Sequence, residues 1–149
     1  MIEFIEDDYE NYAHRTVLNV VNSNITLAIA SNFNTAGEIL TRRCCRNNNK
    51  KYIPMHLHFE DFVKRSNILF SILNNTEIKE IVLNIAGNGI YSTDRTQEDI
   101  DNFVFNLISF QVTHPYANFK IVEIISGGQT GIDEAGLKAG LKLGIKTTC

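Results

Sequence analysis

A glycine-rich segment near the end of the chain has the residue types of a phosphate-binding loop. Residues 126–133 read SGGQTGID and connect a predicted buried strand to a predicted helix. Glycines allow a ligand to approach the backbone closely, and the free N–H groups at a helix start attract an anion. Because no lysine follows the glycines, hydrolysis of a nucleoside triphosphate by a P-loop is disfavoured. We predict a phosphate-binding loop, the alternative being a tight strand-to-helix connection, and its candidate residues are Gly127, Gly128, Gln129, Thr130 and Gly131.

Three further polar loops leave the carboxyl ends of predicted strands, the edge at which ligands bind in open α/β sheets. They span residues 31–38, 56–58 and 87–91. Together they indicate a crevice that is rich in amides, hydroxyls and glycines but poor in catalytic acids and bases. Such a crevice suits a polar molecule that carries phosphate. The asparagines expected at strand ends that face it are Asn32, Asn34, Asn84 and Asn88.

Two acids that open the last predicted helix, Asp133 and Glu134, are the candidate catalytic residues. Either could stabilise an oxocarbenium-like state or activate a water molecule. The alternative is that both acids complement the dipole of the first helical turn without any catalysis.

The two histidines of the sequence His56-Leu57-His58 could form half of a metal site. A site needs further ligands, and no cysteine or carboxylate follows at a suitable spacing. We therefore predict no metal site and no cofactor. The expectation instead is one inward-facing and one solvent-facing histidine.

The elements that must position these residues alternate along the chain. The predicted strands are short, β-branched and almost continuously apolar, which is typical of strands covered on both faces in a parallel sheet. Such alternation predicts an α/β fold with a Rossmann-like, doubly wound, mostly parallel sheet, and no repeat or linker divides residues 1–149 into more than one domain. The predicted strands are 24–30, 51–57 (weakened by Pro54), 78–87, 119–127 and 145–148, and the predicted helices are 8–21, 35–46, 59–73, 96–112 and 132–143.

Composition excludes several classes of protein. The chain has 149 residues, 44% of them hydrophobic, and a formal net charge of −3. It has no apolar run near the ~20 residues of a membrane helix, and its acidic start does not resemble a targeting peptide. The mild acidity argues against general binding to nucleic acid. The three cysteines, Cys44, Cys45 and Cys149, lack the spacing of a disulfide framework, which predicts reduced thiols in a cytoplasmic protein.

The segment 126–133 resembles the SGGQTGxD signature of the molybdenum carrier family, also called the circularly permuted YpsA-type group of the SLOG superfamily. Residues 9–23 are similar to that family's Y-x-x-R-T-x-x-N-V-x-x-S-D helix, and residues 34–37 to its T-G-G/T-x-G loop. Residues 83–87 and 89–91 are similar to its L-N-V-A-G strand end and the G-I-Y that follows. The segments stand in a different order here, with the glycine motif near the carboxyl end, so we interpret the chain as a circular permutation. The family's G-W-x-P-K-G-x loop has no counterpart.

SLOG domains bind nucleotides and nucleotide derivatives, and others are nucleotide phosphoribohydrolases. The resemblance implies that Gly127, Gly128, Thr130 and Gly131 hold phosphate. By the same resemblance Thr35, Gly37, Asn84 and Gly87 line the crevice, and Arg15 and Asn19, one helical turn apart, face the ligand from the opposite wall.

Three hypotheses of function follow. The first is a binding protein that senses or sequesters a nucleotide-derived ligand; an asparagine-rich domain of this size could come from an AT-rich phage and sequester a host immune nucleotide. The second is a nucleotide N-glycosidic hydrolase that uses Asp133 or Glu134. The third, carriage of molybdenum cofactor, rests on the family label alone. The apolar predicted helices 59–73 and 103–112 also lead us to expect a homodimer or larger homo-oligomer.

Overall fold

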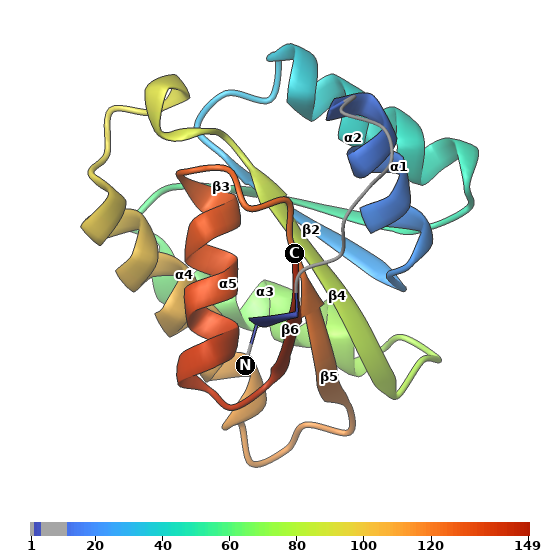
Figure 1. Ribbon diagram of the computed structural model, residues 1–149. Helices are drawn as coiled ribbons and strands as arrows, with labels where there is room; N and C mark the ends of the chain where they lie inside the picture. Colours follow the sequence, from blue (N-terminus) through green and yellow to red (C-terminus); the bar gives the residue numbers. More distant parts are fainter. Residues whose placement is uncertain (1, 4–11) are drawn as a thin grey trace.

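The computed structural model describes residues 2–3 and 12–149, and its strands form a single sheet (Figure 1). The order across the sheet is β1-β6-β5-β4-β2-β3, and each neighbouring pair is parallel. The α/β prediction with a parallel sheet is therefore confirmed. The strands are β1 (Ile2–Glu3), β2 (Ile25–Ala30), β3 (Lys51–His56), β4 (Glu80–Gly87), β5 (Lys120–Ile125) and β6 (Lys146–Thr148).

Five α-helices alternate with the strands, and none in the described part of the chain is long and apolar enough to cross a membrane. The third begins three residues later than predicted, and the part of the predicted helix 8–21 before Tyr12 lies outside the described residues. Strand β1 and the 3-10 turn η1 (Ile90–Ser92) were not predicted, because two or three residues are too few to show a period. The helices are α1 (Tyr12–Val21), α2 (Ala36–Asn47), α3 (Phe62–Asn74), α4 (Gln97–Val112) and α5 (Ile132–Lys142).

Strand β3 lies at the edge of the sheet, which explains how it accommodates a proline. Pro54 pairs in register with Ala28 of β2 and is exposed. A proline has no N–H to donate, so an edge strand tolerates it while a central strand does not.

Alternate residues of the strands point to two different layers. Ile25, Leu27 and Ile29 of β2 belong to a large apolar core that also contains buried residues of α3, α4 and α5. A second, smaller cluster joins Val20 of α1 to Cys44 and Cys45 of α2. Figure 1 shows α1 and α2 side by side, apart from α4 and α5. One face of the sheet is thus packed by three helices, and the other by two.

The connections that leave neighbouring strands diverge between β2 and β4. These two strands are paired, yet the chain leaves β2 into α2 and leaves β4 into α4, which lie in different layers. A divergence of this kind opens a crevice at the carboxyl ends of the strands, where ligands bind in open α/β folds. Residues of the predicted loops 31–38, 87–91 and 126–133 line cavities at this edge, whereas none of residues 56–58 does.

Candidate functional site

A cavity of about 340 Å³ lies at the divergence between β2 and β4. Helices α1 and α2, the end of β4 and the glycine loop after β5 all contribute to its wall. We call it the main cavity, and it is lined by Arg15, Thr16, Asn19, Glu38, Thr41, Asn84, Ala86, Gly87, Gly127, Gly128, Gln129 and Asp133.

A second cavity of about 240 Å³ adjoins the first. The two share Glu38, Gly87 and Gln129, so these residues form the boundary between them. We call it the side cavity, and its other lining residues are Thr35, Gly37, Asn88, Gly89 and Ser92. Most of the predicted ligand-binding residues therefore come together at one place.

The glycine loop offers backbone donors to the main cavity. No hydrogen bond joins the N–H groups of Gly127 or Gly128 to another residue that the structure describes. Gly128 has a φ of 80°, a left-handed conformation that favours glycine. A side chain on Gly127 would also clash, because its Cβ would lie 2.7 Å from Oδ2 of Asp133. The loop thus needs glycine for both conformation and space.

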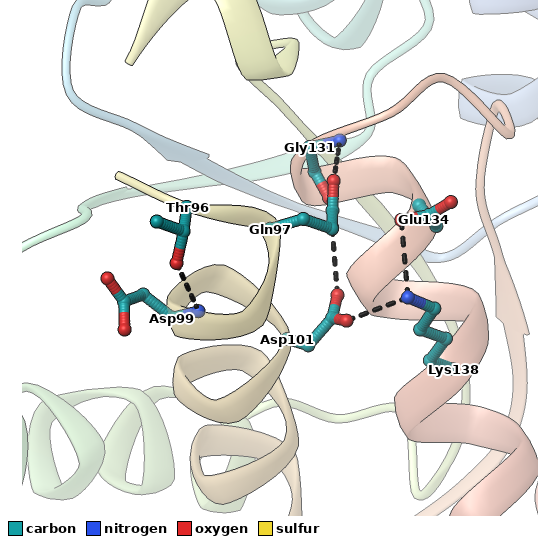
Figure 2. Close-up of polar contacts among 7 residues, drawn as sticks. All are labelled: Thr96, Gln97, Asp99, Asp101, Gly131, Glu134 and Lys138. Carbon is teal, nitrogen blue, oxygen red and sulfur yellow. Dashed lines mark hydrogen bonds and ion pairs between the residues drawn. The ribbon is translucent and has the colours of Figure 1, made fainter. Parts of the chain in front are cut away.

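Gly131 is held by a side chain of α4 (Figure 2). Its N–H donates to Oε1 of Gln97 over 2.7 Å, and Nε2 of Gln97 donates to its carbonyl oxygen over 2.9 Å. Thr96 caps this end of α4 by accepting from the N–H of Asp99. Because the N–H of Gly131 is already bonded within the protein, this residue positions the loop and lines neither cavity.

The two candidate acids differ in their surroundings. Asp133 lines the main cavity and is 8% exposed, whereas Glu134 lies outside both cavities and forms an ion pair of 3.3 Å with Lys138. Figure 2 shows Lys138 between Glu134 and Asp101 of α4. Of the two, only Asp133 is placed to meet a ligand.

Burial raises the pKa of Asp133 to about 7. Hydrogen bonding from the N–H groups of Gln129 and Gly87 offsets part of this rise, while the nearby carboxyl of Glu38 adds to it. At neutral pH this carboxyl is therefore able both to accept and to donate a proton.

Glu38 is a main-cavity residue that the sequence did not single out. It is 4% exposed, burial raises its pKa to about 7, and its Oε2 has no hydrogen-bond partner among the described residues. Its position is fixed by Thr35, the N-cap of α2, whose hydroxyl accepts from the N–H of Glu38 over 3.3 Å. The spacing Thr-x-x-Glu is that of a capping box, which explains a glutamate there without any ligand. The sequence thus contained a glutamate at a recognisable position, but helix capping was sufficient to explain it.

Asn84 presents a second unpartnered acceptor to the main cavity. It is 2% exposed, and its Nδ2 donates to the hydroxyl of Thr26 over 3.1 Å, while its Oδ1 has no partner among the described residues. A hydrogen bond between Thr26 and the thiol of Cys45 lowers the pKa of that thiol, against a larger rise from burial. The hydroxyl oxygen of Thr26 accepts from Nδ2 of Asn84, which leaves Oδ1 of Asn84 without a partner on the cavity wall.

Helix α1 supplies the opposite wall, as the resemblance implied. Arg15 and Asn19 both line the main cavity, and Arg15 is exposed. The guanidinium of Arg15 lowers the pKa of the Cys149 thiol, although burial and the nearby Asp133 raise it overall. Cys149 in turn packs on the glycine loop, since a Cβ on Gly128 would lie 2.6 Å from its sulfur. A positive charge thus stands close to the free loop amides.

Some predicted residues have other positions. Asn88 borders the side cavity, but its side chain is bonded to the loop after β2. Its Oδ1 accepts from the N–H groups of Ser31 and Asn32, and its Nδ2 donates to the carbonyl of Asn32. Asn34 and Thr130, like Gly131 and Glu134, line neither cavity. Whether the cavity-lining residues bind a ligand remains a prediction.

The expectation for the histidine pair was wrong. His56 and His58 are both exposed, and Leu57 between them is buried. His56 is the last residue of the edge strand β3, and His58 lies in the tight turn that follows, in which its N–H donates to the carbonyl of His56 over 2.9 Å. Among the described residues no group of three or more His, Cys, Asp or Glu side chains is placed to hold a metal ion.

A parallel α/β sheet with a glycine loop and a polar cavity at the divergence of its connections defines a Rossmann-like fold. More particularly, the chain belongs to the circularly permutated YpsA SLOG family, whose model matches residues 2–108. The match runs from β1 into α4, so it includes α1, α2 and the end of β4 but ends before the glycine loop. No curated protein and no solved structure matches the chain. Membership supports a role related to nucleotide-type ligands.

Proposed function

We propose that this protein binds a nucleotide-derived small molecule in the main cavity, as a sensor or a sequestering receptor. The observation that carries the proposal is the presence of free donors and free acceptors on the wall of one cavity. Oε2 of Glu38 and Oδ1 of Asn84 are buried without a partner in the described part of the chain. Buried polar atoms are rarely left unpaired, because the loss of hydration costs about 1–3 kcal/mol for each. A bound polar ligand would supply the missing partners.

The phosphate of this ligand would lie against the glycine loop. The N–H groups of Gly127 and Gly128 are available there, and Arg15 adds the one basic side chain that lines either cavity in the described structure. The net charge of −3 provides no general attraction for an anion. Binding of phosphate must therefore depend on these local donors.

The test is recovery of ligand from the protein. The purified chain is incubated with nucleotides, cyclic dinucleotides and ADP-ribose derivatives, washed and denatured, and the released molecules are separated by chromatography. Intact ligand in stoichiometric amount supports binding. If no compound is retained and none is converted, the proposal is wrong.

A pair of glycines controls for the backbone strain of a side chain at a positive φ, and a melting curve of each variant controls for the close contact of a Cβ on Gly128 with Sγ of Cys149. Gly128→Ala and Gly144→Ala each introduce a side chain at a positive φ, of 80° and 69°. Only Gly128 lines the main cavity, and a Cβ on Gly144 meets no atom within 4 Å. We expect Gly128→Ala to lose ligand and Gly144→Ala to retain it.

Sequestration of a host immune nucleotide by a phage protein is the more specific form of this proposal. It requires that the ligand is recovered intact and dissociates slowly. Rapid exchange with an affinity near the cellular concentration would favour a sensor instead.

A nucleotide N-glycosidic hydrolase is the second candidate, favoured by the position and the raised pKa of Asp133. In that reaction water adds to C1′, the C1′–N bond breaks, and the base leaves with a proton while the hydroxyl stays on ribose phosphate. Ionised Asp133 would accept the proton of the water or stabilise the oxocarbenium-like state. Free base in the chromatogram supports this reading. Turnover should fall in Asp133→Asn but not in Glu134→Gln, because Glu134 is outside the cavity.

A further inference from the structure

The unpartnered acceptors of the main cavity come from two separate elements. Oε2 of Glu38 is carried by α2, and Oδ1 of Asn84 by β4. Both side chains are at least nine-tenths buried, and both line the same cavity as the glycine loop. The wall therefore has a donor part, at Gly127 and Gly128, and an acceptor part, at Glu38 and Asn84.

The acceptor part is best suited to hydroxyl donors. A metal ion would need more ligands than it offers, since the described residues contain no cluster of three or more His, Cys, Asp or Glu side chains. A hydroxyl group can rotate its proton to whichever acceptor is near. Two adjacent hydroxyls would satisfy both unpartnered oxygens at once, and neither brings a charge into a buried site.

We infer that Glu38 and Asn84 bind the 2′- and 3′-hydroxyl groups of a ribose whose phosphate is held by the glycine loop. The inference rests on the proposed function and makes it more specific, because it selects ribonucleotides over deoxyribonucleotides. A nucleotide carries a 5′-phosphate and a diol on one sugar, so a single ligand offers partners to both the donors and the acceptors that line this cavity. Loss of one hydroxyl would leave an acceptor buried and unpaired.

The state of Glu38 is compatible with this role. Burial raises its pKa to about 7, so its carboxyl is partly ionised at neutral pH. Hydroxyl groups that donate to it would favour the ionised form. Asp133, whose pKa is also raised to about 7, lies close enough for its negative charge to repel that of Glu38. Ionisation of Glu38 therefore favours the protonated form of Asp133.

The experiment compares AMP, GMP, CMP and UMP with their 2′-deoxy counterparts by calorimetric titration of the full chain. For whichever base binds, we expect the ribonucleotide to bind roughly 10- to 100-fold more tightly, the effect of one hydrogen bond to a charged group. Because a 2′-deoxynucleotide lacks the hydroxyl that one of the two acceptors holds, either Glu38→Gln or Asn84→Ala should reduce this ratio to near unity by weakening the ribonucleotide. Glu134→Gln is the matched control, an acid outside the cavity, and should leave the ratio unchanged.

The possible outcomes separate this inference from the proposed function. If none of these monophosphates binds, the inference fails. The proposed function fails as well only if no compound of the wider panel, with its cyclic dinucleotides and ADP-ribose derivatives, is retained. If ribo- and deoxyribonucleotides bind equally, the proposed function stands and the diol is not recognised. A loss of binding on addition of EDTA would mean that the acceptors hold a cation, which also overturns the inference. A melting curve for each variant establishes that it is folded.

Discussion

The two faces of the sheet are built from the same strands but differ in kind. On β2, the residues Ile25, Leu27 and Ile29 face the large core, while Thr26, Ala28 and Ala30 alternate with them. On β4, Leu83 and Ile85 face the core, and Asn84 and Ala86 line the main cavity. One face is filled by large apolar side chains. The other carries small and polar side chains, and part of it borders the main cavity beneath α1 and α2.

This difference separates stability from ligand binding along a single strand. Adjacent residues such as Leu83 and Asn84 are both almost fully buried, yet one packs in the core and the other presents an unpaired oxygen to a cavity. Burial of an unpaired polar atom is unfavourable for folding, and a ligand bound in the cavity would remove that cost at Asn84. Burial alone therefore does not identify the core of this protein.

Substitution of Leu83 and of its neighbour Asn84 should give the largest difference in the free energy of unfolding. Leu83→Ala removes fully buried methyl groups and should lower the free energy of unfolding by about 3 kcal/mol. Asn84→Ala loses one hydrogen bond but also removes an unpaired oxygen, so its effect should stay below about 1 kcal/mol. Urea denaturation measures both. Equal losses of stability would show that the two faces are not different.

Glu38→Gln should stabilise the protein, and only at higher pH. The pKa of Glu38 is about 7 in the folded protein and 4.5 in an unfolded chain, so between these values the folded state binds more protons. Wild-type stability therefore falls as pH rises from 4.5 to 7, and the cost is fully present above 7.

Glutamine cannot ionise, so it avoids this cost. We expect Glu38→Gln to exceed the wild type by about 2–3 kcal/mol at pH 8, with a much smaller difference at pH 5. Thermal or urea unfolding at the two values of pH gives the comparison. A variant that is less stable than the wild type at pH 8 would contradict the account of a buried carboxyl without a partner.

Gln97→Ala should lower both the stability of the protein and its retention of ligand, by an intermediate amount. It removes both hydrogen bonds to the backbone of Gly131, leaving a buried N–H unpaired at a cost of about 1–2 kcal/mol. The glycine loop would lose its support from α4, so retention of ligand should also decrease. Unfolding and ligand recovery are measured on the same sample. Normal ligand binding in this variant would show that the loop does not depend on α4.

Lys138→Ala should have the smallest effect. Lys138 joins Asp101 and Glu134 by ion pairs of 2.7 Å and 3.3 Å, but its side chain is 45% exposed. Exposed ion pairs contribute about 0–1 kcal/mol and are weakened by salt. We expect a small loss of stability and unchanged ligand recovery. A loss of ligand comparable to that of Gln97→Ala would mean that the ion pairs of Lys138, and not the hydrogen bonds between Gln97 and Gly131, position the loop.

Strands β2 to β6 and the five α-helices were predictable because each carries a local pattern, which β1 and η1 are too short to show. Apolar β-branched runs that end at glycine defined β4 and β5, and Thr35 and Thr96 act as N-caps where polar residues precede α2 and α4. The edge of the sheet that gathers the site follows from the parallel order of strands.

The finer features of the site depend on contacts that are distant in sequence. Gln97 reaches Gly131 across 34 positions, and no local pattern signals that the amide of Gly131 is occupied. Asp133 and Glu134 are neighbours in the same helical turn, and only the packing of α5 turns one into the cavity and the other toward Lys138. Glu38 was hidden by a spacing that is common at helix starts.

Binding of a nucleotide at the polar face is tested most directly by an NMR titration of the ¹⁵N-labelled protein with the nucleotide that is retained best. If the polar face is the binding site, the backbone amides of Gly127, Gly128 and Gln129 and the side-chain amide of Asn84 shift with added nucleotide, while amides of core residues such as Leu107 do not. Shifts confined to the opposite end of the sheet, where Phe119, Gly144 and Ile145 line a separate cavity, would contradict it.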